Sequence, residues 1–304
     1  MRAGLALLMA ALAVAMAQPA TAQPVDDLQR DDARVQTIGW RLSSANAPYC
    51  QRAAPGIGLL LGDVQTFADP ALARTVYGLS GDVAVAAVAA GSPAEAAGLA
   101  ANTVVTAIAG VPVGPAPPRG NWGRFLALQS RLEQTAAKDG KVSLTLGDGR
   151  VVTVPAAPSC GVRFIVDDAK DNAAATRSQV RIGREAMDRL GDDEAMIAAL
   201  LAHELAHAAL DHETVLGTGR RSTAAVRRTE READRLSVWI LANAGYPPEA
   251  APRMIRQIEP RSLLFIPGAS HGKASTRAAE MAAEIKVMRA QPDTNWALRF
   301  RREP

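Results

Sequence analysis

The stretch Ala202-His203-Glu204-Leu205-Ala206-His207 decides how the rest of the sequence is interpreted. In an α-helix, residues four positions apart lie on one face, about one turn apart. His203 and His207 can therefore direct two imidazole rings at one metal ion. Glu204 lies beside them, where its carboxylate can accept a proton from a metal-bound water. The stretch thus predicts one half of a catalytic metal site.

The apolar sequence around this stretch predicts a buried helix from Glu194 to His212. The preceding Gly191-Asp192-Asp193 supplies an N-cap and places acidic groups at the positive end of the helix dipole. Burying two histidines and a glutamate is costly unless these groups find partners. A metal site would provide the partner that such a helix requires.

A third protein ligand is needed, because catalytic zinc commonly takes three and leaves the fourth position to water. Glu230 and Asp234 are four positions apart and share one helix face. Glu230 is the predicted third ligand, and Asp234 is predicted to accept a hydrogen bond from a ligand histidine. Glu232 points ~200° away and is predicted to lie on a solvated face that pairs with nearby arginines. Such a solvated face is also the alternative interpretation of Glu230 and Asp234.

His212 follows His207 by five positions, about 140° around a continuous helix. It cannot join the same site unless the helix is broken between the two residues. We therefore expect His212 to be a surface or capping histidine near the helix end, and not a metal ligand.

Composition allows a globular protein, and charge decides little about its function. The chain has 304 residues, of which 48% are hydrophobic, enough for a sizeable core. Its 34 basic and 31 acidic residues leave none of the positive excess that nucleic-acid binding requires. We therefore expect no nucleic-acid partner.

Residues 1–22 have the pattern of a signal peptide. Arg2 precedes an apolar run from Leu5 to Ala17, and Ala20-Thr21-Ala22 offers a cleavage site. An earlier cut after Ala17, or an uncleaved anchor helix, is the alternative. No later stretch is long and apolar enough to cross a membrane, so we expect a periplasmic or secreted mature chain without a transmembrane segment.

Cys50 and Cys160 are the two cysteines of the chain, and neither lies in a Cys-x-x-Cys pattern. In an oxidising compartment, an even number of cysteines favours one disulfide bond between them. Two free buried thiols are the alternative.

The sequence before Cys160 shows two kinds of pattern. Residues 26–44 are predicted to form an amphipathic helix, and the segment 23–50 is expected to pack on the C-terminal domain. Short strands and turns follow, with strands predicted at 56–61, 82–88, 104–110, 142–146 and 151–154. A helix is predicted from Phe125 to Ala137, with Leu126, Leu128 and Leu132 on its apolar side.

Residues 51–157 resemble a PDZ domain of the bacterial protease type, most closely from Gly91 through Leu99 to Gly110. The resemblance implies a β-sandwich or barrel that takes the C-terminus of a peptide ligand. The loop Gly56-Ile57-Gly58-Leu59 would offer backbone N–H groups to the peptide carboxylate, and the adjoining strand edge would pair with its main chain. A spacer or lid that binds no peptide is the alternative role.

The C-terminal region, residues 158–304, is predicted to contain strands at 162–166 and 178–182 and a helix at 185–190. His203-Glu204-x-x-His207 with Glu230-x-x-x-Asp234 resembles the HtpX-like and CAAX-prenyl-protease-like zinc metallopeptidases, in their soluble, exported branch. The match extends from about Cys160 to Arg277. It implies one zinc ion per chain, held by two histidines and one glutamate.

The same resemblance implies roles for two further segments, one before the edge strand of the substrate cleft and one that contains His271. Asp171-Asn172-Ala173 would precede the strand at the edge of the substrate cleft. His271 would lie near the cleft, where it stabilises the transition state or occupies the open zinc position. A loop histidine without a role is the alternative.

The expected fold class is α+β, with a mainly helical zincin-type domain that contains a small sheet, and a PDZ-like domain. The expected function is that of an exported zinc metalloendopeptidase that cleaves proteins or peptides, in cell-envelope protein quality control. The alternative is a peptide-binding, chaperone-like envelope protein whose metal site is closed. An enzyme held inactive until a partner activates it is a third interpretation.

Overall fold

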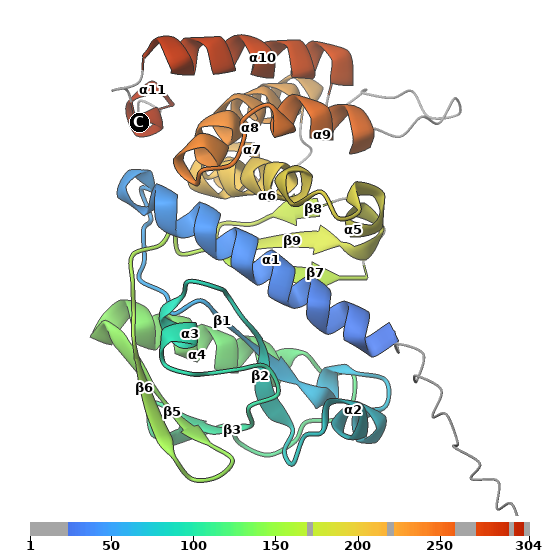
Figure 1. Cartoon of the computed structure of the whole chain (residues 1–304), viewed down its shortest axis with the longest axis vertical. Coiled ribbons are helices and arrows are strands. Elements are labelled where there is room, and N and C mark those ends of the chain that lie inside the picture. The colour runs from blue at the N-terminus through green and yellow to red at the C-terminus, as the bar shows by residue number, and fades with distance from the viewer. Residues whose placement is uncertain (1–23, 169–172, 218–221, 259–271, 292–294, 301–304) are drawn as a thin grey trace, which may run out of the picture.

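The structure, a computed structural model, describes residues 24–168, 173–217, 222–258, 272–291 and 295–300. The predicted signal peptide at residues 1–22 and His271 lie outside these ranges. The fold is α+β, as expected, with a mainly helical body and a β-rich body on opposite sides of the long helix α1, Pro24–Asn46 (Figure 1). None of the helices in the described ranges combines the length and the apolar character needed to cross a membrane.

The helical body is built around α6, Glu194–Ala209, which is buried on almost all sides. α8, Thr223–Asn243, packs on α6, and α10, Ala274–Ala290, lies against α8. α9, Ala250–Ile258, packs on α6 and α10. The shorter helices of this body are α5, Arg184–Leu190, α7, His212–Leu216, and α11, Trp296–Arg299. Leu200, Leu201, Leu205, Leu236 and Ile240 belong to its single apolar core.

A three-stranded sheet closes the other side of α6 (Figure 1). Its strands are β7, Arg163–Asp167, β8, Ala173–Ala175, and β9, Gln179–Gly183, in the order β7-β9-β8. β7 runs parallel to β9, and β8 runs antiparallel to it, so β8 is the edge strand next to α6 in the described sheet.

α1 belongs to the helical body although it precedes the β-rich body in sequence. Val35, Ile38 and Leu42 form its buried face and join the same core as α6 and α8. Gly39 allows close packing, because a Cβ at this position would overlap the ring of Phe164. At the end of α1, Asn46 donates to the carbonyl of Ile240, 3.1 Å away.

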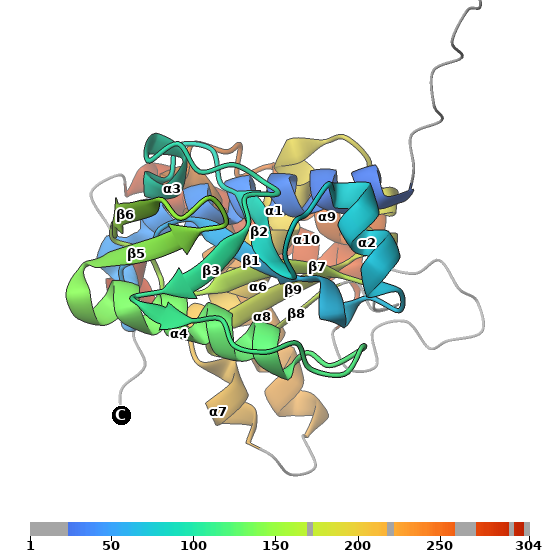
Figure 2. The same ribbon diagram turned by 90° about the horizontal axis from the view of Figure 1, so that it is seen from below.

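The β-rich body has a separate core between two small sheets and α4, Gly123–Asp139. One sheet pairs β1, Leu59–Asp63, with β2, Val83–Val88. The other has the order β4-β3-β5-β6, formed by Val111–Pro112, Val105–Ile108, Lys141–Leu146 and Val151–Pro155. The shorter elements are η1, Ala47–Tyr49, η2, Val64–Thr66, α2, Pro70–Tyr77, and α3, Pro93–Ala96. Seen from below, β3 and β5 lie on the viewer's side of β7 and β9 (Figure 2).

Two expectations for the β-rich body are wrong in detail. The first strand begins at Leu59 and not at Gly56, because Gly58 has a φ of 70°, which interrupts an extended strand. Leu126 is 43% exposed, and the buried face of α4 instead carries Phe125, Leu128, Leu132 and Ala136. α4 therefore turns a slightly different face to the core from the one predicted.

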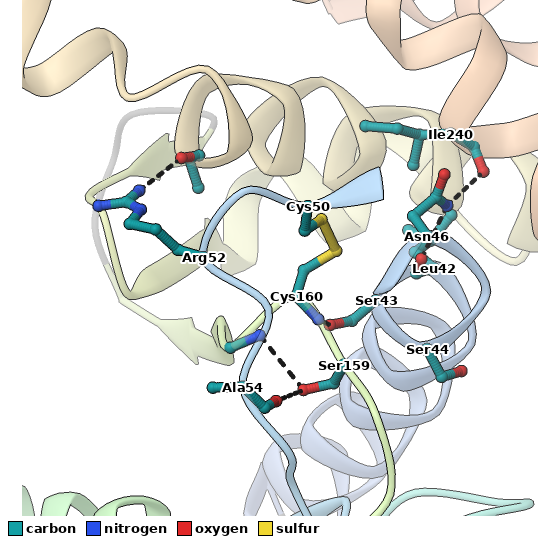
Figure 3. The surroundings of a disulfide bond; sticks show 12 residues. Leu42, Ser43, Ser44, Asn46, Cys50, Arg52, Ala54, Ser159, Cys160 and Ile240 are labelled. Atoms are coloured by element: carbon teal, nitrogen blue, oxygen red, sulfur yellow. Dashed lines mark hydrogen bonds between the residues drawn. A yellow bond between two sulfur atoms is a disulfide. The ribbon is translucent and has the colours of Figure 1, made fainter. Parts of the chain in front are cut away.

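The predicted disulfide between Cys50 and Cys160 is present, with the two Cα atoms 5.4 Å apart (Figure 3). It joins the points where the chain enters and leaves the β-rich body. The backbone N–H of Cys160 donates to Ser43 of α1, and the Ser159 hydroxyl donates to the carbonyl of Ala54 (Figure 3). The two connecting segments are thus held side by side.

Candidate metal centre

Two helices bring the three predicted ligands together. His203 and His207 come from α6 and Glu230 from α8, and their ligand atoms form a compact group. The two Nε2 atoms are 3.2 Å apart, and each lies 3.5 Å from an oxygen of Glu230. His203 and Glu230 are buried, and the His207 side chain is only 15% exposed.

These three side chains lie close enough together to hold one metal ion. Ligand atoms about 2.0–2.2 Å from a zinc ion are about 3.3–3.5 Å from one another in a tetrahedron. The two Nε2 atoms are 3.2 Å apart and each is 3.5 Å from a different oxygen of Glu230, so the three side chains are close enough to share one ion. Two imidazole nitrogens and one carboxylate are also a donor set that zinc commonly takes in catalytic sites. The group of His203, His207 and Glu230 can therefore bind a metal ion.

Asp234 lies one turn beyond Glu230 and is completely buried. Its Oδ1 is 3.1 Å from Nδ1 of His203, although no described atom is aligned with that nitrogen as a good hydrogen-bond partner. The contact is therefore mainly electrostatic, and it turns the Nε2 side of His203 toward Glu230. Asp234 thus lies beside His203, a candidate ligand, but the predicted hydrogen bond between them is not formed with good geometry.

Arg277 on α10 is a part of the centre that the sequence did not reveal. It donates to both carboxylate oxygens of Asp234, at 2.6 and 2.7 Å, and its Nη2 is 3.2 Å from Glu230. Arg277 shares a helix face with the buried Met281 and Ile285. An arginine on an apolar helix face needs a buried acidic partner, and this was the available signal in the sequence.

Asp234 and Glu230 stabilise the protonated, positively charged form of His203. Burial acts to lower the pKa of His203, but Asp234 and Glu230 outweigh it and raise the pKa to about 10. Burial acts to raise the pKa of Asp234, yet Arg277 and His203 hold it below its ordinary value. An environment that stabilises a cation in this way is also what a metal site requires.

For His207 and Glu204, in contrast, burial favours the uncharged form of the side chain. Burial, together with the neighbouring His203, holds the pKa of His207 well below its ordinary value, which keeps its ring neutral and able to coordinate. Burial raises the pKa of Glu204 to about 7, the range suited to a general base near neutral pH. The centre thus contains one neutral imidazole, that of His207, and a carboxylate, that of Glu204, that exchanges a proton near neutral pH.

His212 is not a surface residue, so this expectation is wrong. α6 ends at Ala209, and Asp211 adopts a left-handed conformation with φ of 53° before α7 begins at His212. This break turns His212 back, and its Nδ1 lies 2.9 Å from Nδ1 of His207. Its Nε2 lies 3.1 Å from Glu232, so Glu232 is not simply part of a solvated face either.

The predicted segment at the edge of the substrate cleft, residues 171–173, and the predicted cleft residue His271 lie largely outside the described ranges. His271, Asp171 and Asn172 fall in ranges that are not described, whereas Ala173 begins the edge strand β8.

The loop Gly56-Ile57-Gly58-Leu59 borders a cavity of about 680 Å³, counted with its open mouth, between α4 and α1. The β1 edge beside this loop is already hydrogen-bonded. The buried side chain of Gln129 accepts the N–H of Leu61 at 2.9 Å and donates to the carbonyl of Leu59 at 3.3 Å. These are the two groups that an added peptide strand would use.

No protein-family model, curated protein or solved structure matches this chain. The resemblances to zinc metallopeptidases and to PDZ domains therefore stay predictions from the sequence.

Proposed function

We propose that this protein is a zinc-dependent metalloendopeptidase similar to the HtpX-like and CAAX-prenyl-protease-like enzymes. The observation that carries the proposal is the close approach of His203, His207 and Glu230, whose nearest nitrogen and oxygen atoms are 3.2–3.5 Å apart, with Glu204 next in sequence to His203. A structural site would use a fourth protein ligand and would have no need for a general base.

The roles of the residues follow from their positions. His203, His207 and Glu230 would hold a zinc ion, which would supply the Lewis acidity to activate a water molecule and polarise a peptide carbonyl. Glu204 accepts a proton from that water and delivers it to the leaving amine nitrogen. Asp234, held by Arg277, orients His203.

The edge strand β8 supports the proposal that the substrate is an extended peptide. β8 lies at the edge of its described sheet and packs beside α6, the helix that carries both histidines. A peptide that added to β8 as another strand would pass along this helix. Ala173–Ala175 have short side chains, which leave room for the side chains of the peptide.

The β-rich body would serve as a PDZ-like regulator whose groove is closed in this conformation. Gln129 occupies the hydrogen-bonding groups of β1, and Arg163 of β7 forms two 2.7 Å hydrogen bonds to Glu133 of α4. A peptide would have to displace Gln129 before it could pair with β1. The β-rich body thus braces α1 and β7 until a ligand opens the groove.

Export to an oxidising compartment is part of the proposal. The Cys50–Cys160 disulfide supports it, because such bonds persist in the periplasm and outside the cell. Protein quality control in the cell envelope is the role that fits an exported endopeptidase with a regulatory groove.

The test combines metal analysis with a cleavage assay on the purified full-length protein. We expect one zinc per chain and cleavage of unfolded casein. Glu204→Gln should retain zinc and lose cleavage by at least ~1,000-fold, because only the proton transfer is removed. Glu185→Gln, at an exposed position on α5, is the matched control and should cleave normally. Zinc without cleavage in the wild-type protein would instead favour the chaperone-like alternative.

A further inference from the structure

A buried chain of hydrogen-bonding groups continues from His207 away from the candidate metal centre. His212, 1% exposed, lies with its Nδ1 2.9 Å from Nδ1 of His207. On its other side, Nε2 of His212 lies 3.1 Å from Oε2 of Glu232. The order of groups is therefore Glu232, His212, His207, and then the ligand position at Nε2 of His207.

The protons in this chain have one arrangement when Glu232 is ionised and His212 is neutral. The carboxylate of Glu232 can only accept, so Nε2 of His212 carries the hydrogen. Nδ1 of His212 then has a lone pair and must accept from Nδ1–H of His207. This leaves a lone pair on Nε2 of His207, the atom that faces Glu230. The chain thus selects the tautomer of His207 that can bind a metal ion.

We propose that His212 and Glu232 are positioning residues that fix the tautomer and the ring orientation of His207 for metal binding. The proposal rests on the proposed function in that it takes His207 as a ligand. Each ligand histidine then has a carboxylate behind it. Asp234 contacts His203 directly, whereas Glu232 acts on His207 through a second imidazole.

The break between α6 and α7 brings His212 into contact with His207. In a continuous helix, His212 would point ~140° away from His207. The left-handed conformation of Asp211 reverses the chain instead, and it is unusual for a residue other than glycine. Arg177 holds Asp211 with two hydrogen bonds of 2.9 and 3.0 Å. An unusual conformation with its own support indicates a structural purpose.

The first experiment measures zinc affinity of the full-length protein by competition with a chromophoric chelator. We expect His212→Phe to weaken zinc binding by ~10–100-fold, as for other groups behind a metal ligand. His212→Gln should stay within ~3-fold of the wild type, because its amide can accept from His207 and donate to Glu232. Val215→Ala, at an exposed position on α7, is the matched control and should not change zinc affinity.

Variants of Glu232 provide a second set of zinc-affinity measurements. Glu232→Ala should weaken zinc binding, but adding it to His212→Phe should cause no further loss, since both act through one chain. The visible absorption of the cobalt-substituted protein should change in His212→Phe and stay the same in His212→Gln. Wild-type affinity and an unchanged cobalt spectrum in His212→Phe would overturn the proposal.

A measurement that needs neither metal nor cleavage separates this proposal from the proposed function. Long-range ¹H–¹⁵N spectra of protein labelled at its four histidines report the tautomer of each ring. We expect His207 to be protonated at Nδ1 only in the wild type and in His212→Gln, and to show a mixture in His212→Phe. A mixture in the wild type would refute the positioning role. A fixed tautomer in a protein that binds no zinc would refute the metallopeptidase function alone.

Discussion

The guanidinium of Arg277 donates to both carboxylate oxygens of Asp234, although the two residues are 43 positions apart in the sequence. Both side chains are buried, and Arg277 also lies 3.2 Å from Glu230. The contact fastens α10 to α8 directly behind the candidate ligands. α10 is therefore part of the candidate metal centre, although none of its described residues is a candidate ligand.

Replacing Arg277 should destabilise the protein and weaken the metal site together. Arg277→Met leaves the buried carboxylate of Asp234 without its main partner, which commonly costs about 3–5 kcal/mol. Urea unfolding should show this loss, and zinc affinity should fall because Asp234 is then free to turn. In Arg277→Met/Asp234→Asn, removal of the buried charge should restore part of the stability. A single variant as stable as the wild type would contradict this account.

Removing Gln129 should open the β1 edge to a peptide. In Gln129→Ala, the N–H of Leu61 and the carbonyl of Leu59 lose their partner, at a cost of about 1–3 kcal/mol for buried groups. A fluorescent peptide with a free, apolar C-terminus should then bind more tightly than to the wild type, as measured by anisotropy. Gln134→Ala, exposed on the same helix, should not bind more tightly. Equal binding by Gln129→Ala and the wild type would show that Gln129 does not close the groove.

Stability should depend on pH through Asp32. Burial raises the pKa of this side chain on α1 from 3.8 to about 7, even though the N–H of Val166 donates to it. The folded protein therefore keeps the proton up to about pH 7, whereas the unfolded chain loses it near pH 4. The contribution of Asp32 to stability thus falls as the pH rises through this interval and stays low above it.

The measurement compares free energies of unfolding for Asp32→Asn and the wild type. The free energy of unfolding of Asp32→Asn, relative to that of the wild type, should rise from pH 4.5 to pH 8, because the variant has no charge to bury at position 32. Asp27→Asn, near the same end of α1 but with half of its side chain exposed, is the control for a change in net charge. Curves for Asp32→Asn and the wild type that stay parallel over this range would disprove the assignment.

Loss of the disulfide should lower the stability of the whole chain. The Cys50–Cys160 bond closes a loop with a sequence separation of 110, for which chain entropy gives about 5 kcal/mol. Cys50→Ser/Cys160→Ser should unfold at a lower urea concentration by a corresponding amount. Because these are the only two cysteines, a reductant should shift the wild type toward the variant and leave the variant unchanged. A reductant effect on the variant would point to another cause.

Helix periodicity predicted the centre of the candidate site well. Residues four positions apart share a helix face, so spacing placed His203 with His207 and Glu230 with Asp234. That the two pairs meet depends on the packing of α6 against α8. The disulfide and the α+β class were also predictable, from an even number of cysteines and from the change of pattern along the chain.

The missed contacts depend on features that spacing does not encode. His212 reaches His207 because Asp211, a residue without a glycine's freedom, adopts a left-handed conformation supported by Arg177, 34 positions away. Gln129 lies on a helix with ordinary amphipathic spacing, and its role appears only once α4 lies beside β1. These contacts arise from tertiary packing, which local sequence does not determine.

The position of the disulfide has a consequence for how such a protein can be rebuilt. The chain leaves the helical body at Cys50 and returns at Cys160, where the Cα atoms are 5.4 Å apart. Consecutive Cα atoms are about 3.8 Å apart, so a single bridging residue spans this gap. Exchanging the β-rich body at this point would therefore leave the path of the backbone that carries the candidate ligands unchanged, but it would uncover Ala33 and Ile165, which pack on that body.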